Sequence, residues 1–141
     1  MQRWLWLFVL TFTTWSAVTF ARDGSWFVAM MMLGVGWGLA WWVSPWKGGR
    51  SVRHRDVLAM PQSERQVVIY WRPGCQFCAR LKSALGPAGA RAVWVNIWQD
   101  RDAAAYVRSV NEGNETVPTV IIDDDVHTNP KPDLVASRLG S

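Results

Sequence analysis

Hydrophobic residues are distributed very differently in the first 46 residues and in the rest of the chain. Residues 4–21 contain no charged side chain, and neither do residues 26–46. A helix rises about 1.5 Å per residue, so roughly 20 apolar residues cross a bilayer core. With the polar turn 22–25 between them, these two segments predict a transmembrane helical hairpin over residues 1–46. Gly34 and Gly38 have a spacing that permits close helix packing, although glycine is common in membrane helices.

From residue 66 onward, apolar residues follow the periodicities of short strands and amphipathic helices. Runs rich in β-branched and aromatic residues indicate buried strands, and helical spacing of apolar residues indicates helices between them. The helix after the first strand has Phe77, Leu81, Ala84 and Leu85 at helical spacing. The order is β-α-β-α-β-β-α, an α/β domain over residues 66–141. The predicted strands are 67–71, 92–97, 119–122 and a short one near Val126, and the predicted helices are 75–85, 101–112 and 129–139.

Charge separates a basic segment, residues 47–65, from the regions on either side. The chain of 141 residues has a net charge of +4, and residues 47–60 hold four basic side chains against one acidic. Residues 61–141 hold nine of each. A basic protein can bind nucleic acid, but an excess beside an apolar segment fits membrane topology better. We therefore interpret residues 47–65 as a basic linker, with a lipid bilayer and no nucleic acid as partner.

The placement of basic residues also predicts the orientation of the hairpin. Arg3 precedes the first span and four basic residues follow the second, whereas the connecting turn holds only Arg22. The positive-inside bias then places both ends in the cytoplasm. A signal peptide ending at residues 19–21 is an alternative, and it leaves the orientation of the second span unchanged. We expect a multi-pass protein of the plasma membrane with its C-terminal domain facing the cytoplasm.

A Cys-Gln-Phe-Cys motif, Cys75 to Cys78, directly follows the first predicted strand and opens the next helix. Helix positions three apart share a face, which brings the two Cα atoms within reach of a disulfide. The first cysteine lies at the positive end of the helix dipole, where unpaired amide N–H groups stabilise a thiolate. Arg72 adds a nearby positive charge. These positions predict Cys75 as the nucleophile and Cys78 as the resolving thiol.

Two cysteines are too few for a disulfide scaffold. A structural zinc site normally needs four ligands, and His54 and His127 lie far from the motif in sequence. A zinc site shared between two chains and a pair of unreactive buried cysteines are the alternatives to a redox pair. The three aspartates at 123–125 fit an acidic turn better than a cation site. We therefore predict no metal.

The residues around the motif resemble the glutaredoxin family. Trp71-Arg72-Pro73-Gly74-Cys75-Gln76-Phe77-Cys78, followed by Thr116-Val117-Pro118-Thr119-Val120, is similar to the glutaredoxin branch of the thioredoxin fold. The stretch 110–120, together with 128–130, more closely resembles the mycoredoxins, which are glutaredoxin-like proteins of bacteria that use mycothiol. The similarity covers roughly residues 66–139. It implies a thioredoxin-like (glutaredoxin) fold, here preceded by two transmembrane α-helices.

The resemblance also implies roles for individual residues. Pro118 would follow a cis peptide bond beside Cys75, and Val117 would offer its backbone N–H and C=O to a bound low-molecular-weight thiol. Arg72 matches a basic position that helps hold the carboxylate of the small thiol or the thiolate. Phe77 and Thr116 are the remaining predicted thiol-binding residues. A solvated surface arginine is the alternative for Arg72.

The small thiol is predicted to be mycothiol in preference to glutathione. Many glutaredoxins have proline between the cysteines and a Gly-Gly pair after the third strand that helps bind glutathione; this chain has Gln76-Phe77 and the aspartates 123–125. Glu115 is also unfavourable beside an anionic ligand. We expect no bound cofactor, with the small thiol acting as a co-substrate.

Together these features predict a membrane-anchored thiol–disulfide oxidoreductase. It would reduce mixed disulfides between proteins and a low-molecular-weight thiol through Cys75. Three alternatives remain open: a redoxin reduced by thioredoxin reductase, a non-catalytic membrane redox sensor, and a domain outside the cell that acts on secreted disulfides.

Overall fold

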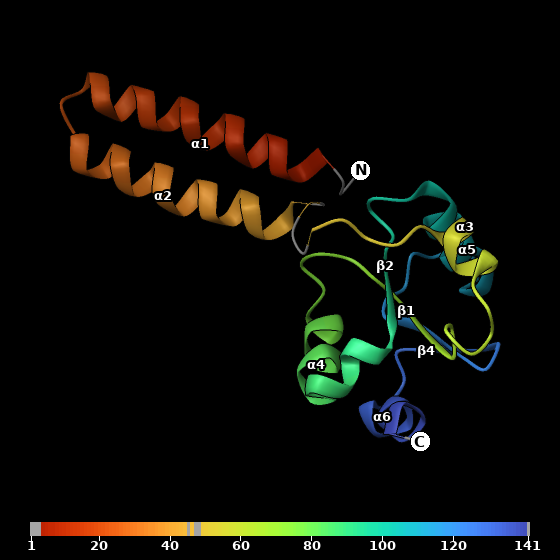
Figure 1. Cartoon of the computed structure of the whole chain (residues 1–141). Helices are drawn as coiled ribbons and strands as arrows, with labels where there is room; N and C mark the ends of the chain where they lie inside the picture. Colours follow the sequence, from red (N-terminus) through yellow and green to blue (C-terminus); the bar gives the residue numbers. More distant parts are fainter. Residues whose placement is uncertain (1–3, 45, 47–48, 141) are drawn as a thin grey trace. The chain divides into compact units, whose positions relative to one another are not determined.

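The chain divides into two compact units, residues 1–47 and 48–141. The computed structural model in Figure 1 describes residues 4–44, 46 and 49–140. Arg3 and Lys47, on which the predicted orientation partly rests, lie outside the described residues. Each unit has its own architecture.

The first unit is a hairpin of two helices, α1 (Leu5–Arg22) and α2 (Trp26–Val43). A three-residue turn joins them, and Gly24 adopts a positive φ of 80° there. Both helices are long and apolar enough to cross a membrane. Their bounds lie within three residues of the predicted spans, although α1 includes the charged Arg22 and α2 ends at Val43, before the uncharged run does.

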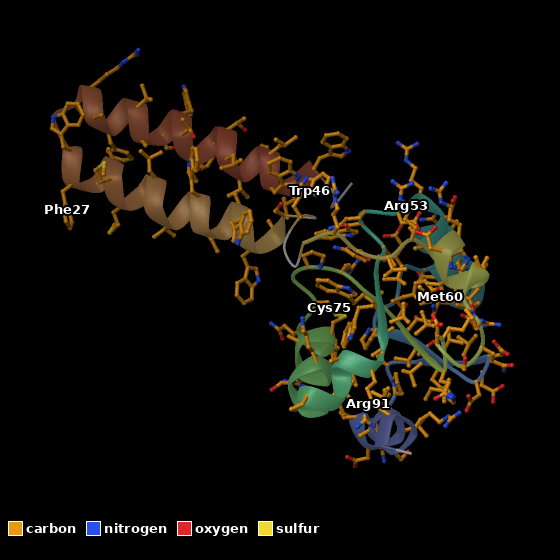
Figure 2. All side chains as sticks on the ribbon, in the orientation of Figure 1. Phe27, Trp46, Arg53, Met60, Cys75 and Arg91 are labelled. Atoms are coloured by element: carbon orange, nitrogen blue, oxygen red, sulfur yellow. A yellow bond between two sulfur atoms is a disulfide. The ribbon has the colours of Figure 1, made fainter. Side chains whose placement is uncertain are left out.

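Within the hairpin, only small residues are buried between the helices, namely Ala17, Ala29, Gly36 and Ala40. Most of the large side chains point outward, as Figure 2 shows for Phe27. Gly36 is the glycine that allows close approach, since a Cβ atom there would overlap the side chain of Thr13. Gly34 and Gly38, whose spacing suggested packing, have open space beside them.

The second unit is built on a four-stranded mixed sheet in the order β2-β1-β3-β4. β1 and β2 run parallel, whereas β3 is antiparallel to β1 and β4 is antiparallel to β3. β1 is central and buried, as its continuous apolar run predicts. The strands are β1 (Val67–Trp71), β2 (Val93–Asn96), β3 (Thr119–Ile122) and β4 (Asp125–Thr128).

Helices cover both faces of this sheet (Figure 1). Alternate residues of β1 point to opposite faces, so Val68 and Tyr70 pack with the helix α5 and Val67 and Ile69 pack with α4 and α6. The predicted order β-α-β-α-β-β-α is confirmed. The helices are α4 (Gln76–Leu85), α5 (Arg101–Val110) and α6 (Pro132–Gly140).

Several element boundaries in the second unit differ from the prediction by one to three residues, and the start of α6 differs most. α4 ends at Leu85 with Gly86 as its C-cap residue, as predicted, and Gly86 and Pro87 then open a 3₁₀ helix, η2 (Gly86–Arg91), that the sequence did not indicate. α6 begins at Pro132 rather than at Asn129. Asn129 adopts a left-handed φ of 49° and its backbone N–H donates to the carbonyl of Pro118 (2.8 Å), so it forms a turn and no helix start.

Residues 49–59 are attached to the sheet, although a linker was expected here. The Ser51 hydroxyl accepts a hydrogen bond from the Asn96 N–H (2.6 Å) and donates one to the Trp94 carbonyl (3.2 Å). Gln99 accepts from the Ser51 N–H and donates to the carbonyl of Gly49. These bonds satisfy the open edge of β2. Local sequence did not indicate them, because each bond joins residues more than 40 positions apart.

After this edge the chain forms a short helix, α3 (His54–Ala59), on the same face as α5. The His54 N–H donates to Asp100 (2.7 Å), and the His54 ring stacks on Tyr106 with its Nδ1 2.7 Å from the Tyr70 hydroxyl oxygen. Burial, with smaller contributions from Tyr106 and Asp100, raises the pKa of the Tyr70 phenol well above its usual value. Tyr70 is therefore protonated at neutral pH. We name residues 49–59 the strap.

Candidate active site

Cys75 stands at the junction between β1 and α4. Gly74 makes the turn with a φ of 75°, and Cys75 has extended backbone angles as the N-cap residue of α4. The helix therefore begins at Gln76, one residue later than predicted. The Cys75 Sγ accepts a hydrogen bond from the N–H of Cys78 (3.1 Å), the role that a serine or aspartate oxygen plays at other helix starts. This donor stabilises negative charge on the sulfur.

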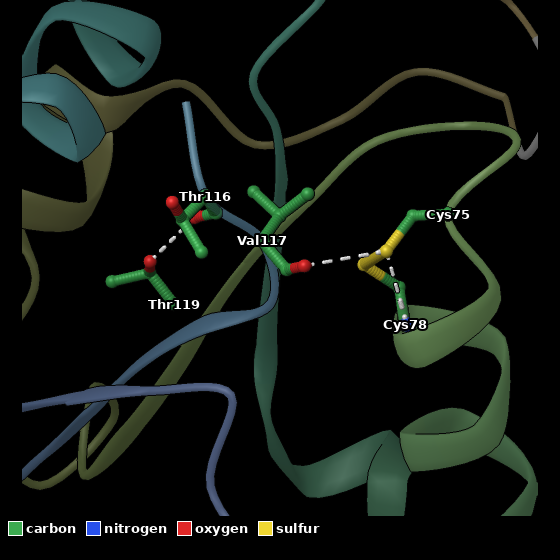
Figure 3. Close-up of a disulfide and its surroundings, with 5 residues drawn as sticks. All are labelled: Cys75, Cys78, Thr116, Val117 and Thr119. Carbon is green, nitrogen blue, oxygen red and sulfur yellow. Dashed lines mark hydrogen bonds between the residues drawn. A yellow bond between two sulfur atoms is a disulfide. The ribbon is translucent and has the colours of Figure 1, made fainter. Parts of the chain in front are cut away.

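Cys75 and Cys78 form a disulfide, with their Cα atoms 5.3 Å apart (Figure 3). Cys78 is 3% exposed, whereas Cys75 is only partly buried. An attacking thiol can therefore reach the sulfur of Cys75 more readily than that of Cys78. This difference in exposure matches the prediction that Cys75 is the nucleophile and Cys78 the resolving thiol. Both roles remain predictions.

The loop before β3 lies against the first cysteine. The Val117–Pro118 peptide bond is cis, as the family resemblance implies. The carbonyl oxygen of Val117 lies 3.4 Å from the Cys75 Sγ (Figure 3). Val117 and Pro118 are therefore brought to the cysteine from some forty residues away, and a molecule bound to the sulfur would meet this backbone.

A buried polar network holds the base of that loop. The Asn111 side-chain amide donates to the Val107 carbonyl (2.8 Å) and to the Thr119 hydroxyl (3.0 Å), and it accepts from the Thr128 hydroxyl (2.6 Å). The Thr119 hydroxyl in turn donates to the Thr116 carbonyl (2.8 Å). Asn111 thus connects α5, β3 and β4. Sequence reasoning missed it, and the one available signal was its place in the mycoredoxin-like stretch.

The other predicted thiol-binding residues occupy different settings. The Arg72 guanidinium lies over the indole of Trp98, 5.9 Å from the ring centroid. Phe77 is 54% exposed, and Arg80 lies over its ring. Thr116 is partly buried, with its carbonyl bonded to Thr119. Thiol binding by Arg72, Phe77 and Thr116 remains a prediction.

The buried face of α4 differs from the face that helical spacing suggested. The expected face was Phe77, Leu81, Ala84 and Leu85, but the buried residues are Cys78, Leu81 and Leu85. Cys78 lies on the buried face of the helix with Leu81 and Leu85, and a residue one position earlier is rotated from Cys78 by about 100°. Phe77 and Ala84 consequently face solvent.

Three of the four acidic residues considered in the sequence, Glu115, Asp123 and Asp124, form ion pairs. Glu115 forms an ion pair with Arg108 (2.5 Å), which offsets the negative charge that seemed unfavourable for an anionic ligand. Asp123 pairs with Arg138, whose hydrogen bonds hold the pKa of this carboxyl below its usual value, and Asp124 pairs with Arg65. Across residues 4–44, 46 and 49–140, no group of three His, Cys, Asp or Glu side chains is arranged to hold a metal.

The mixed sheet, its flanking helices and the disulfide at a helix start define a thiol–disulfide oxidoreductase with a thioredoxin-like fold. A glutaredoxin family model matches residues 67–127. A glutaredoxin-like protein of Mycobacterium tuberculosis is 43% identical over 74 residues, which are 52% of this chain and 88% of the relative. Mycoredoxin 1 of Corynebacterium glutamicum is 40% identical over 65 residues, which are 45% of this chain and 80% of the relative. The chain belongs to the glutaredoxin family, with a redox-active Cys75–Cys78 pair.

Proposed function

We propose that this protein is a membrane-anchored oxidoreductase that reduces mixed disulfides between proteins and mycothiol. The observation that carries the proposal is the arrangement of the two sulfurs. Cys75 is accessible, is held by a helix N–H and lies beside the Val117 carbonyl, whereas Cys78 is buried one turn deeper. Such an arrangement suits a nucleophile with a resolving partner.

The reaction consists of thiol–disulfide exchanges. The Cys75 thiolate attacks the mycothiol sulfur of the mixed disulfide, forms a Cys75–mycothiol disulfide and releases the client thiolate. A second mycothiol then attacks, giving mycothiol disulfide and the Cys75 thiolate. Alternatively, Cys78 attacks and releases mycothiol, leaving the intramolecular disulfide. The Cys75–Cys78 disulfide must then be reduced by two thiols before the next turnover.

One observation supports mycothiol as the small thiol, namely that Mycoredoxin 1 is among the relatives. Asp123, where the sequence suggested a missing glutathione contact, does not add to this support. The antiparallel pairing of β1 and β3 puts Asp123 beside Gln66, at the end of the sheet away from Cys75.

We assign α1 and α2 to the plasma membrane, with the redox unit in the cytoplasm. Both helices have the length and apolar composition for crossing. The basic residues that precede α1 and follow α2, against a single arginine in the turn, give the orientation. The cytoplasm is also where small thiols keep such proteins reduced.

The test uses the full chain in lipid nanodiscs and a peptide–mycothiol mixed disulfide. We expect Cys75→Ser to abolish release of the peptide thiol and Cys78→Ser to retain it with mycothiol as the donor. Equal loss in both variants would instead indicate a dithiol cycle, and reduction by thioredoxin reductase but not by mycothiol would identify the redoxin alternative. Absence of turnover with every donor would leave the sensor alternative.

Sidedness is tested separately in intact cells. A membrane-impermeant thiol reagent should leave reduced Cys75 unlabelled until the cells are permeabilised. A permeant reagent of the same reactivity serves as the control. Labelling of Cys75 in intact cells would place the redox unit outside and contradict the proposed orientation.

A further inference from the structure

A cleft of about 360 Å³ opens beside the edge strand β2 within the redox unit. Two indoles, from Trp71 and Trp94, form its apolar walls, and their rings meet edge to face with centroids 6.5 Å apart. Both indoles are partly exposed. Arg50 of the strap and Lys82 of α4 supply the charged part of the lining. We name this the indole cleft.

The charge of the indole cleft is positive and unbalanced. Its lining contains no acidic residue. The Lys82 Nζ lies 6.0 Å from the Trp71 ring centroid and 5.7 Å from that of Trp94, so both rings hold the ammonium at the cleft. Within the described part of the chain, neither Lys82 nor Arg50 forms an ion pair. The cleft therefore offers two cations, with apolar walls, to an anion.

The strap keeps this cleft close to the end of α2 along the chain. Gly49 and Ser51 are bound to the edge of β2 and its following turn, and the same segment lines the cleft. α2 ends at Val43. Because a residue spans at most about 3.6 Å, the six residues from Val43 to Gly49 span no more than roughly 22 Å.

We propose that the indole cleft binds the phosphate of an anionic phospholipid headgroup. The proposal rests on the membrane anchoring proposed above, which places α2's cytoplasmic end at the bilayer surface. Tryptophan is enriched in the headgroup layer. The Trp94 indole N–H donates to the Gly89 carbonyl (2.8 Å), so this ring contributes apolar surface to the cleft. Lysine and arginine are attracted to anionic lipid in the headgroup layer. Binding would hold one face of the redox unit against the membrane.

Contact of the indole cleft with lipid can be measured by comparing the reactivity of two lysines in the same chain. Its three lysines are Lys47, Lys82 and Lys131. Lys82 lines the cleft, while Lys131 is exposed before α6 and does not line it. The acylation rate of each lysine can be read by mass spectrometry on the full chain in nanodiscs. One set of discs contains phosphatidylcholine only, and a matched set contains roughly one third phosphatidylglycerol.

We expect the anionic discs to slow acylation of Lys82, relative to Lys131, by about five-fold, the factor equivalent to ~1 kcal/mol per basic residue near an anionic surface. Arg50→Gln should reduce this protection. Arg101→Gln, which removes an exposed arginine outside the cleft, should leave it unchanged.

Equal Lys82 reactivity in both kinds of disc, or equal protection of Lys82 and Lys131, would overturn the proposal. Protection by soluble glycerol phosphate in the zwitterionic discs would identify a small-anion site and overturn lipid docking. Retention of the chain in the discs on gel filtration is measured in parallel. Failure to be retained contradicts the anchor and the docking site together, whereas retention without protection contradicts the docking site alone.

Discussion

The two units of this protein bury opposite kinds of residue. In the hairpin, the buried positions are small, as at Ala29 and Gly36, and most of the large side chains face outward, with Phe27 82% exposed. In the redox unit, Ile69 and Val95 are completely buried within the sheet.

The difference shows which unit carries its own hydrophobic stabilisation. Burial of large apolar side chains is the dominant favourable term in folding, and the redox unit has it inside. The hairpin presents its apolar surface to the surroundings, and its two helices pack closely through small residues. The four predictions below test this contrast, from the largest expected effect to the smallest.

Truncation of the redox core should have the largest effect. Ile69→Ala should lower the free energy of unfolding of the redox unit by about 2–5 kcal/mol, because it leaves a cavity at a fully buried position. Hydrogen exchange of the most protected β1 amides, in the full chain in nanodiscs, measures this. Phe27→Ala is the control and should leave those amides unchanged. A comparable loss from Phe27→Ala would break the distinction between the units.

In the hairpin, adding one methyl group should matter more than removing a large side chain. Gly36→Ala should destabilise the helix pair by about 1–3 kcal/mol, because the new Cβ meets the side chain of Thr13. Gly38→Ala, which has open space, is the matched control. SDS titration followed by tryptophan fluorescence reports on the hairpin, which holds eight of the eleven tryptophans. Equal midpoints for both variants would contradict the packing described here.

Asn111→Ala tests the role of the buried polar network in the redox unit. It should cost about 1–2 kcal/mol of unfolding free energy by leaving buried partners unsatisfied. Since the loop at Val117 loses its support, KM for the mixed disulfide should rise more than kcat falls. Steady-state kinetics checks this, with the exposed Asn114→Ala as control. Loss of stability with unchanged KM would restrict Asn111 to a structural role.

The smallest effect concerns the surface pair of Asp123 and Arg138. Since this pair lowers the pKa of Asp123 in the folded state, its contribution to stability is present above the usual carboxyl pKa and is lost as pH falls through the lowered value. The difference in urea midpoint between the wild type and Asp123→Asn should therefore be small at neutral pH and absent in strong acid. Asp125→Asn is the control. A difference that persists in acid would exclude ionisation as its cause.

Much of the fold could be predicted because its elements carry local signals. The continuous apolar run Val67–Trp71 became the buried central strand, and uncharged segments became α1 and α2. The strap was missed because Ser51 and His54 act through partners far along the chain. Helical spacing also misassigned Phe77, since periodicity indicates a shared face but not which neighbouring face turns inward.

The cysteine pair of the candidate site was readable from spacing, since two cysteines one turn apart at a strand–helix junction need no distant partner to be recognised. The family resemblance supplied Val117 and Pro118, and the structure places the Val117 carbonyl oxygen 3.4 Å from the Cys75 Sγ. For Asn111, the only signal was its place in the mycoredoxin-like stretch 110–120, which did not indicate its role. Its three side-chain hydrogen bonds exist only after α5, β3 and β4 have come together.

By itself, the sequence determined the apolar spans, the order of strands and helices, and the position of the redox motif, because each depends on residues within a few positions of one another. Tertiary structure alone decided that the sulfur of Cys75 meets a carbonyl 42 residues away, that the strap closes the edge of β2, and that two indoles and a lysine share a cleft. These contacts join distant segments, and their geometry is set by packing of the whole unit.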